Sequence, residues 1–106
     1  MRSGYGEKGF LFPMDERYRR NPEFILREIA GESILVPTGQ AALAFNGLAS
    51  LNASGVFLWG LLERERSLAE LGLLLAREYG LAEETARADA ADFLQPALER
   101  NVVLRC

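Results

Sequence analysis

The spacing of apolar residues changes near Leu51, and this change constrains the fold more than any other feature of the chain. Before it, short apolar runs are separated by glycine-containing turns, a pattern typical of antiparallel strands. After it, leucines and alanines recur every three or four residues, which is the period of an amphipathic helix. A chain of 106 residues is long enough for one small core. We therefore predict one α+β domain.

Three strands are predicted ahead of this change. Residues 24–30 and 33–37 flank a turn that contains Gly31, and two β-rich runs joined in this way indicate a hairpin. Residues 43–49 follow a second turn and would complete a three-stranded antiparallel sheet. Gly47 lies inside this third strand, which predicts a bulge or a close approach of another backbone.

Two capped helices are predicted after the change. Asn52 is a good N-cap for the first helix, which would run to about Glu63. Ser67 and Glu70 form the capping-box pair that begins the second helix. Gly80 is placed to end it, because glycine readily adopts the left-handed conformation found after helices.

A third helix is predicted over residues 83–100, with Pro96 inside it. Proline lacks a backbone N–H and clashes with the carbonyl four residues earlier, so we expect a kink or break there. Residues 102–104 would then add to a sheet edge or cover the core. A three-stranded antiparallel sheet followed by three helices has the outline of a winged helix-turn-helix domain.

The first 23 residues differ from the rest of the chain. They hold three of the ten glycines and two of the four prolines, with no sustained period. We expect residues 1–23 to form an extended or partly disordered arm and residues 24–106 to form the folded domain. The aromatic residues of the arm would dock on that domain or reach a second subunit.

The composition excludes several kinds of chemistry. The chain has no histidine and a single cysteine, Cys106. This removes histidine-assisted nucleophiles, internal disulfides, cysteine cages and histidine-containing zinc sites. An enzyme would have to use carboxylates such as Asp89 and Asp92, but two acids on one helix are more typical of a solvated face. We therefore expect a binding protein that is not an enzyme and carries neither a cofactor nor a metal.

Charge and hydropathy limit the partners. The net charge is −3, and no segment forms a basic stripe. No apolar stretch approaches the length of about 18 residues that suggests a membrane span, and no signal peptide is recognisable. We expect a cytoplasmic protein that binds neither nucleic acid nor membrane.

Four segments carry a resemblance to a known family. They are LREIAGE at residues 26–32, ILVPTG at 34–39, LNASGVFLWGLL at 51–62 and DAADFL at 89–94. In this order they resemble the PqqD family, which is named for the coenzyme PQQ synthesis protein D. The resemblance implies a small chaperone, the RiPP precursor peptide recognition element. Such domains bind the leader of a ribosomally made peptide and present it to a modifying enzyme, often a radical S-adenosylmethionine protein.

In that family the peptide adds a strand to the third strand and lies beside the third helix. Carried over to this sequence, the resemblance places the peptide between residues 43–49 and 86–98. The candidate peptide-binding residues are Leu43, Phe45, Gly47, Arg87, Ala91, Leu94 and Leu98. Of these, Phe45, Leu94 and Leu98 could instead belong to the core. We expect Leu94→Glu to weaken peptide binding without unfolding the domain.

Two other functions compete with peptide binding. A DNA-binding winged helix would use the third helix. Residues 83–100 hold five acids against two arginines, and this negative charge would repel the phosphates of DNA. A dimeric assembly protein without a ligand of its own would use free strand edges or the aromatic arm. Trp59 lies on an apolar face, and we expect it in the core with its indole N–H at the rim.

Overall fold

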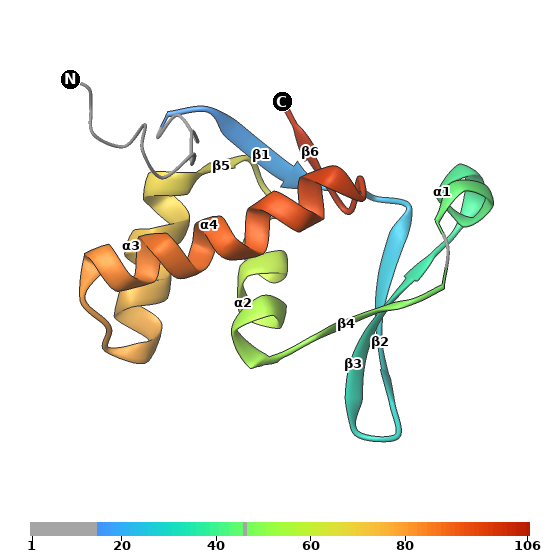
Figure 1. The fold of residues 1–106 in the computed structure, drawn as a ribbon, viewed down its shortest axis with the longest axis horizontal. Helices are drawn as coiled ribbons and strands as arrows, with labels where there is room; N and C mark the ends of the chain where they lie inside the picture. Colours follow the sequence, from blue (N-terminus) through green and yellow to red (C-terminus); the bar gives the residue numbers. More distant parts are fainter. Residues whose placement is uncertain (1–14, 46) are drawn as a thin grey trace.

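The computed structural model describes residues 15–45 and 47–106. In these residues two three-stranded antiparallel sheets accompany four helices (Figure 1). The elements are β1 (Arg17–Arg20), β2 (Phe24–Ile29), β3 (Glu32–Pro37), α1 (Gly39–Ala44), β4 (Ala49–Leu51), α2 (Ala53–Leu61), β5 (Arg66–Ser67), α3 (Leu68–Tyr79), α4 (Glu83–Glu99) and β6 (Val103–Arg105). The predicted α+β class is confirmed, and the winged helix-turn-helix comparison is loose but compatible with this arrangement.

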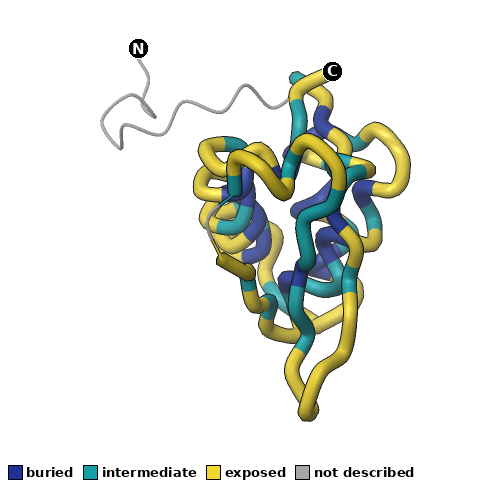
Figure 2. Tube along the Cα trace, turned by 90° about the vertical axis from the view of Figure 1, so that its right-hand side faces the viewer, coloured by how far each residue is buried: buried dark blue, intermediate teal, exposed yellow. Residues whose placement is uncertain are grey.

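The sheet β2-β3-β4 is built from consecutive segments. Its first two strands form the predicted hairpin, and the two residues of the turn are Ala30 and Gly31, with φ of 52° and 82°. Positive φ at both positions is the geometry that suits a tight hairpin, because its twist matches that of the strands. The tip of the hairpin is exposed and extends away from the rest of the protein (Figure 2).

The prediction for the third strand is wrong over most of its length. Residues 39–44 form helix α1, and β4 covers only Ala49–Leu51. The segment from residue 39 to 49 has no β-branched residue, while alanine, leucine and glutamine favour helix. The carboxylate of Glu23 also accepts a hydrogen bond of 2.8 Å from the backbone N–H of Ala41, which satisfies one of the free donors at the start of the helix.

The sheet β5-β1-β6 joins three segments that are far apart in the sequence. Its central strand, β1, lies in the part of the chain that we predicted to be an arm, and Tyr18 on this strand has no exposed surface. The prediction of an arm is therefore corrected for residues 17–20, which form β1 and contribute Tyr18 to the core. A four-residue strand with one apolar side chain is too short to produce a recognisable period. Residues 1–14 of the predicted arm lie outside the described residues.

The C-terminal segment completes the same sheet. Val103 on β6 lies opposite Arg20 on β1, and both Val102 and Val103 are buried. The expectation that residues 102–104 join a sheet edge and cover the core is confirmed, although the sheet is not the hairpin sheet. Asn21 extends the connection by donating from its backbone N–H to the carbonyl of Val102 at 2.9 Å.

The signals that begin and end the helices are confirmed. The side chain of Asn52 accepts a hydrogen bond of 2.8 Å from the N–H of Gly55 at the start of α2. Ser67 and Glu70 exchange the two hydrogen bonds of the capping box at the start of α3. Gly80 follows α3 with φ of 65°. These features are local in the sequence, and each satisfies backbone groups that a helix end leaves free.

Of the kink or break predicted at Pro96, the break is wrong, because α4 continues through it to Glu99. Proline removes the N–H that would bond to the carbonyl of Asp92. Both residues are exposed, so water can bond to that carbonyl, and only one turn of helix remains after Pro96. Helix α4 packs on α3 where Gly72 allows a close approach; a Cβ there would lie 3.0 Å from the Cα of Arg87.

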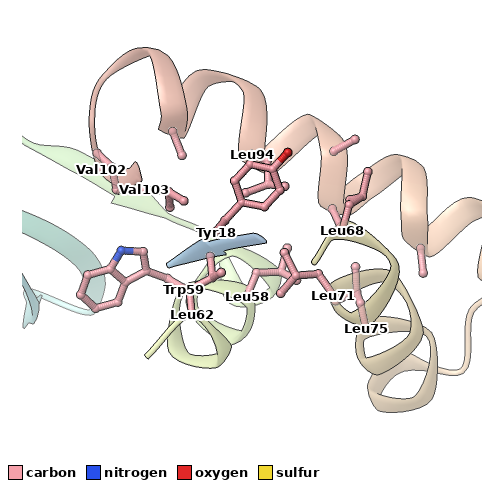
Figure 3. Close-up of a cluster of buried hydrophobic side chains, with 14 of the residues drawn as sticks. Tyr18, Leu58, Trp59, Leu62, Leu68, Leu71, Leu75, Leu94, Val102 and Val103 are labelled. Carbon is pink, nitrogen blue, oxygen red and sulfur yellow. The ribbon is translucent and has the colours of Figure 1, made fainter. Parts of the chain in front are cut away.

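One buried cluster joins the helices to β1 and β6 (Figure 3). Its largest fully buried side chains are Tyr18, Leu35, Leu58, Leu62, Leu71, Leu75, Leu94 and Val103. Trp59 is also buried, with the guanidinium of Arg20 4.5 Å from its ring centroid. The expected position of its indole N–H at the rim is wrong, because Nε1 is buried and has no hydrogen-bond partner among the described residues.

None of the helices in the described part of the chain combines the length and apolar character that a membrane crossing requires.

Candidate functional site

Strand β4 is an edge strand of the hairpin sheet. It pairs with β3 on one side, where Ala49, Ser50 and Leu51 lie opposite Leu35, Ile34 and Ser33. Within residues 15–45 and 47–106, no strand pairs with its other side. An edge of this kind leaves backbone N–H and C=O groups available to an added strand.

The two faces of β4 differ. Its central residue, Ser50, is exposed, whereas Ala49 and Leu51 on either side are half-buried against the core. The residue before the strand, Leu48, is exposed, and Gly47 before it has φ of 89° with open space around its Cα. The edge therefore offers a short backbone ladder next to apolar side chains on the inner face.

Phe45 connects the approach to β4 with helix α4. Its ring makes an edge-to-face contact with Phe24 on β2, with centroids 5.0 Å apart and planes at 79°. On the α4 side, the guanidinium carbon of Arg100, the residue that follows the helix, lies 4.3 Å from the centroid of the same ring. The C-terminal end of α4 is thus fixed beside the segment that leads into β4.

This contact identifies the flank of α4 that lies toward the hairpin sheet. Residues three and seven positions before Arg100 share its side of a helix, and these are Ala97 and Phe93. Ala97 is buried and Phe93 is half-buried against the core. We did not include these three residues among the candidates, although their spacing of four and three positions was a readable signal.

The candidates on α4 lie between about a quarter and a half of a turn away from this flank. Leu94 and Ala91 are fully buried, at 0% and 1% exposure, and Leu98 is half-buried against the core. The backbone of Arg87 packs on Gly72 of α3. The expectation that Leu94→Glu would leave the domain folded is corrected, because a carboxylate there would be placed in the core.

The candidates before β4 fall in different surroundings. Leu43 lies on α1 and not on a strand, and 82% of its surface is exposed. Gly47 lies in a bend ahead of β4 and not in a bulge within a strand. Phe45 contacts the core, as described above. Phe45 and Gly47 thus lie in the segment that leads into β4, whereas Leu94 and Ala91 are buried in the core and the backbone of Arg87 packs on α3.

The ion pairs of the described residues gather around β1. Arg17 lies 3.4 Å from Glu65 and 3.6 Å from Glu70, and Arg105 lies 3.4 Å from Glu16. These side chains are largely exposed, so each pair contributes little to stability. Burial, with a smaller effect from Glu16, raises the pKa of Tyr18 to about 12. Tyr18 is therefore neutral at ordinary pH and serves packing rather than acid–base chemistry.

Comparison with known proteins gives a fold and a family. The structure is similar to the solution NMR structure of the PqqD truncation of Methylobacterium extorquens PqqCD, which is described as a functional and stand-alone RiPP recognition element. The TM-score is 0.69 at 15% sequence identity, over 92% of this chain and 99% of that chain. A search of curated proteins found no match. The model of the family described as coenzyme PQQ synthesis protein D (PqqD) matches residues 24–103, and the chain therefore belongs to the PqqD family.

Proposed function

We propose that this protein is a recognition element that binds the leader of a ribosomally made precursor peptide and presents it to a modifying enzyme. Membership of the PqqD family supports this function, as does the fold shared with a RiPP recognition element. The observation that carries the proposal is the unpaired side of β4, which lies next to apolar side chains and the C-terminal end of α4.

The proposed binding mode is addition of the peptide as a further strand on β4. Backbone hydrogen bonds give a net gain of roughly 0.5 to 1.5 kcal/mol each, and β4 has only three paired residues. Ordering a disordered peptide costs about 2 to 5 kcal/mol or more. Micromolar binding corresponds to about 8 kcal/mol, so apolar contacts must supply most of it. Phe45 and Phe93, which are half-buried, are the side chains we propose for these contacts.

The modifying enzyme supplies the reaction in this proposal. A radical S-adenosylmethionine protein is the expected partner, as the resemblance to the family implies. A gene for such an enzyme and a short peptide gene next to the gene for this chain would support that assignment. A pull-down of the enzyme that depends on added peptide would test the presentation step separately from peptide binding.

The binding step is tested by titrating the ¹⁵N-labelled full chain with synthetic peptides that represent the short reading frames beside its gene. We expect one peptide to bind with micromolar or tighter affinity. Its amide shifts should concentrate at residues 47–51 and in the C-terminal half of α4, while amides near the hairpin turn should change little. No shift at β4 with any of these peptides would contradict the proposal.

A dimeric assembly is the second candidate, and one observation favours it. Ile25 and Ile29 on β2, the other edge strand of the hairpin sheet, are exposed. Apolar side chains on an open edge favour pairing between copies. Light scattering of the full chain gives its mass in solution, and Ile29→Lys should convert any dimer formed through this edge to a monomer.

A further inference from the structure

The guanidinium group of Arg100 lies on a residue of the segment that leads into the proposed binding edge. The group lies over the ring of Phe45, and Phe45 comes four residues before β4 in the chain. Phe45 also contacts Phe24, which pairs with Pro37 at the end of the β2-β3 ladder. Leu35, the partner of Ala49, lies two residues from Pro37. These contacts place Arg100 beside Phe45, at the end of the hairpin sheet where β2 begins and β3 ends.

The hydrogen-bonding capacity of this guanidinium is unused within the described part of the chain. The ion pairs found there involve Arg17 and Arg105, and no side-chain hydrogen bond involves Arg100. A guanidinium stacks through its flat face, whereas its five N–H donors point outward in the plane of the group. Stacking on Phe45 therefore holds the guanidinium group in place and leaves its N–H donors available for hydrogen bonds in the plane of the group.

We propose that Arg100 selects peptides that carry an aspartate or glutamate side chain next to the segment paired with β4. A planar carboxylate matches the fork of a guanidinium and accepts two parallel hydrogen bonds. The contact with Phe45 restricts the arginine side chain in advance, so less rotamer freedom is lost on binding. This inference rests on the proposed function, because it assigns a preference to the same edge.

The test uses a library of random peptides with fixed flanking sequences, selected by display on the full-length protein. The fixed flanks keep terminal carboxylates away from the selected segment. Three proteins are compared: wild type, Arg100→Glu and the control Arg77→Gln. Arg77 is exposed in the last turn of α3, near the beginning of α4, so it is about 25 Å from Arg100 along a 17-residue helix.

Wild type and Arg77→Gln should enrich an acidic residue at one position of the selected peptides, and Arg100→Glu should enrich lysine or arginine there. For one selected peptide, changing its acidic residue to the amide should weaken binding to wild type about two- to fivefold, the range of an exposed ion pair with good geometry. The same change should have no effect on the Arg100→Gln variant. Thermal melting of each variant checks that it is folded.

The outcomes separate the two proposals. Peptides that bind wild type and shift the amides of β4, but show the same residue preference with Arg100→Glu, would overturn the role of Arg100 and leave the proposed function intact. If no peptide is selected, or if selected peptides leave β4 unshifted, the proposed function fails and the role of Arg100 fails with it.

Discussion

The two sheets have the same number of strands but differ in how they are assembled. Sheet β5-β1-β6 joins segments from the beginning, the middle and the end of the described chain. Its central residue, Tyr18, is completely buried, and the ion pairs lie around it. Sheet β2-β3-β4 is made from consecutive segments, with an exposed hairpin tip and an open edge on β4. Among the described residues, the first sheet joins the two ends of the fold to its middle, whereas the second contains β4, the short edge strand that we propose as the binding edge.

Because of this difference, we expect substitutions in one sheet to affect stability and substitutions in the other to affect binding. Long-range pairing in β5-β1-β6 holds both ends of the domain on the helices, so substitutions there should destabilise the whole fold. Strand β4 has three residues, and among the described residues it pairs with β3 alone. The predictions below test this division, beginning with the largest effect.

The largest effect is expected for Leu94→Glu. Leu94 is fully buried in the cluster that backs β1, so the variant combines loss of an apolar side chain with burial of a charge. We expect a loss of about 4 kcal/mol or more in the free energy of unfolding, measured by urea denaturation. The control Leu73→Glu, at an exposed position on α3, should change stability by less than about 1 kcal/mol. Equal effects of the two substitutions would contradict the assignment of Leu94 to the core.

Tyr18→Ala compares the two sheets directly. Removing a fully buried aromatic ring should cost about 3 to 5 kcal/mol, because the surrounding helices cannot fill the space. Leu48→Ala beside β4 removes a side chain that is more than half exposed, and should cost less than about 0.5 kcal/mol. Thermal and urea unfolding measure both. A small effect at Tyr18 would mean that β1 is not needed to close the core.

The stability that Tyr18 contributes should depend on alkaline pH. Burial raises its pKa to about 12 from an ordinary value of 10.0. The folded state therefore holds the phenolic proton more tightly, so this contribution is complete below about pH 10 and is lost as the pH rises toward 12. Urea unfolding of wild type across this range should show the decrease. Tyr18→Phe should lack the part of the decrease that comes from Tyr18. If the variant and wild type lose stability identically with pH, Tyr18 does not titrate as described.

The smallest of these effects is expected for Ser67→Ala. Ser67 lies on β5, the strand beside β1, and caps α3 through its side-chain oxygen. Loss of that cap should cost about 1 kcal/mol, measured by thermal unfolding. Ser50→Ala on β4 removes an exposed hydroxyl that accepts and donates no hydrogen bond among the described residues, and should leave the melting temperature unchanged. A larger loss of stability for Ser50→Ala than for Ser67→Ala would contradict the view that β5-β1-β6 is the sheet that stabilises the fold.

The sequence allowed some parts of this structure to be predicted because their causes are local. The capping box at Ser67 and Glu70, the cap at Asn52 and the hairpin at Gly31 each depend on a few neighbouring residues. Strand β1 could not be predicted, because a single apolar residue between arginines has no period and is buried only through partners distant in the sequence. Helix α1 was missed, and residues 43–49 were predicted as a strand, because the run of alanine and leucine is short and follows two real strands.

The candidate residues on α4 were chosen from its apolar pattern. A helical pattern shows which residues are apolar, but not which of them lie in the core and which stay half-buried. Leu94 and Ala91 are fully buried, whereas Phe93 is half-buried and Arg100, which follows the helix, lies against Phe45. The position of Phe45 after α1 could not be predicted, because residues 43–49 were expected to form one strand.

Hydrogen–deuterium exchange tests the central claim most directly. The full chain is compared with and without a bound peptide, and exchange is followed at individual amides by NMR. Our account predicts that fast-exchanging amides between residues 47 and 51 become protected, while amides on the outer side of β2 keep their rates. Protection at β2 or β6, with the amides of β4 unchanged, would contradict the claim that the open edge of β4 is the peptide-binding site.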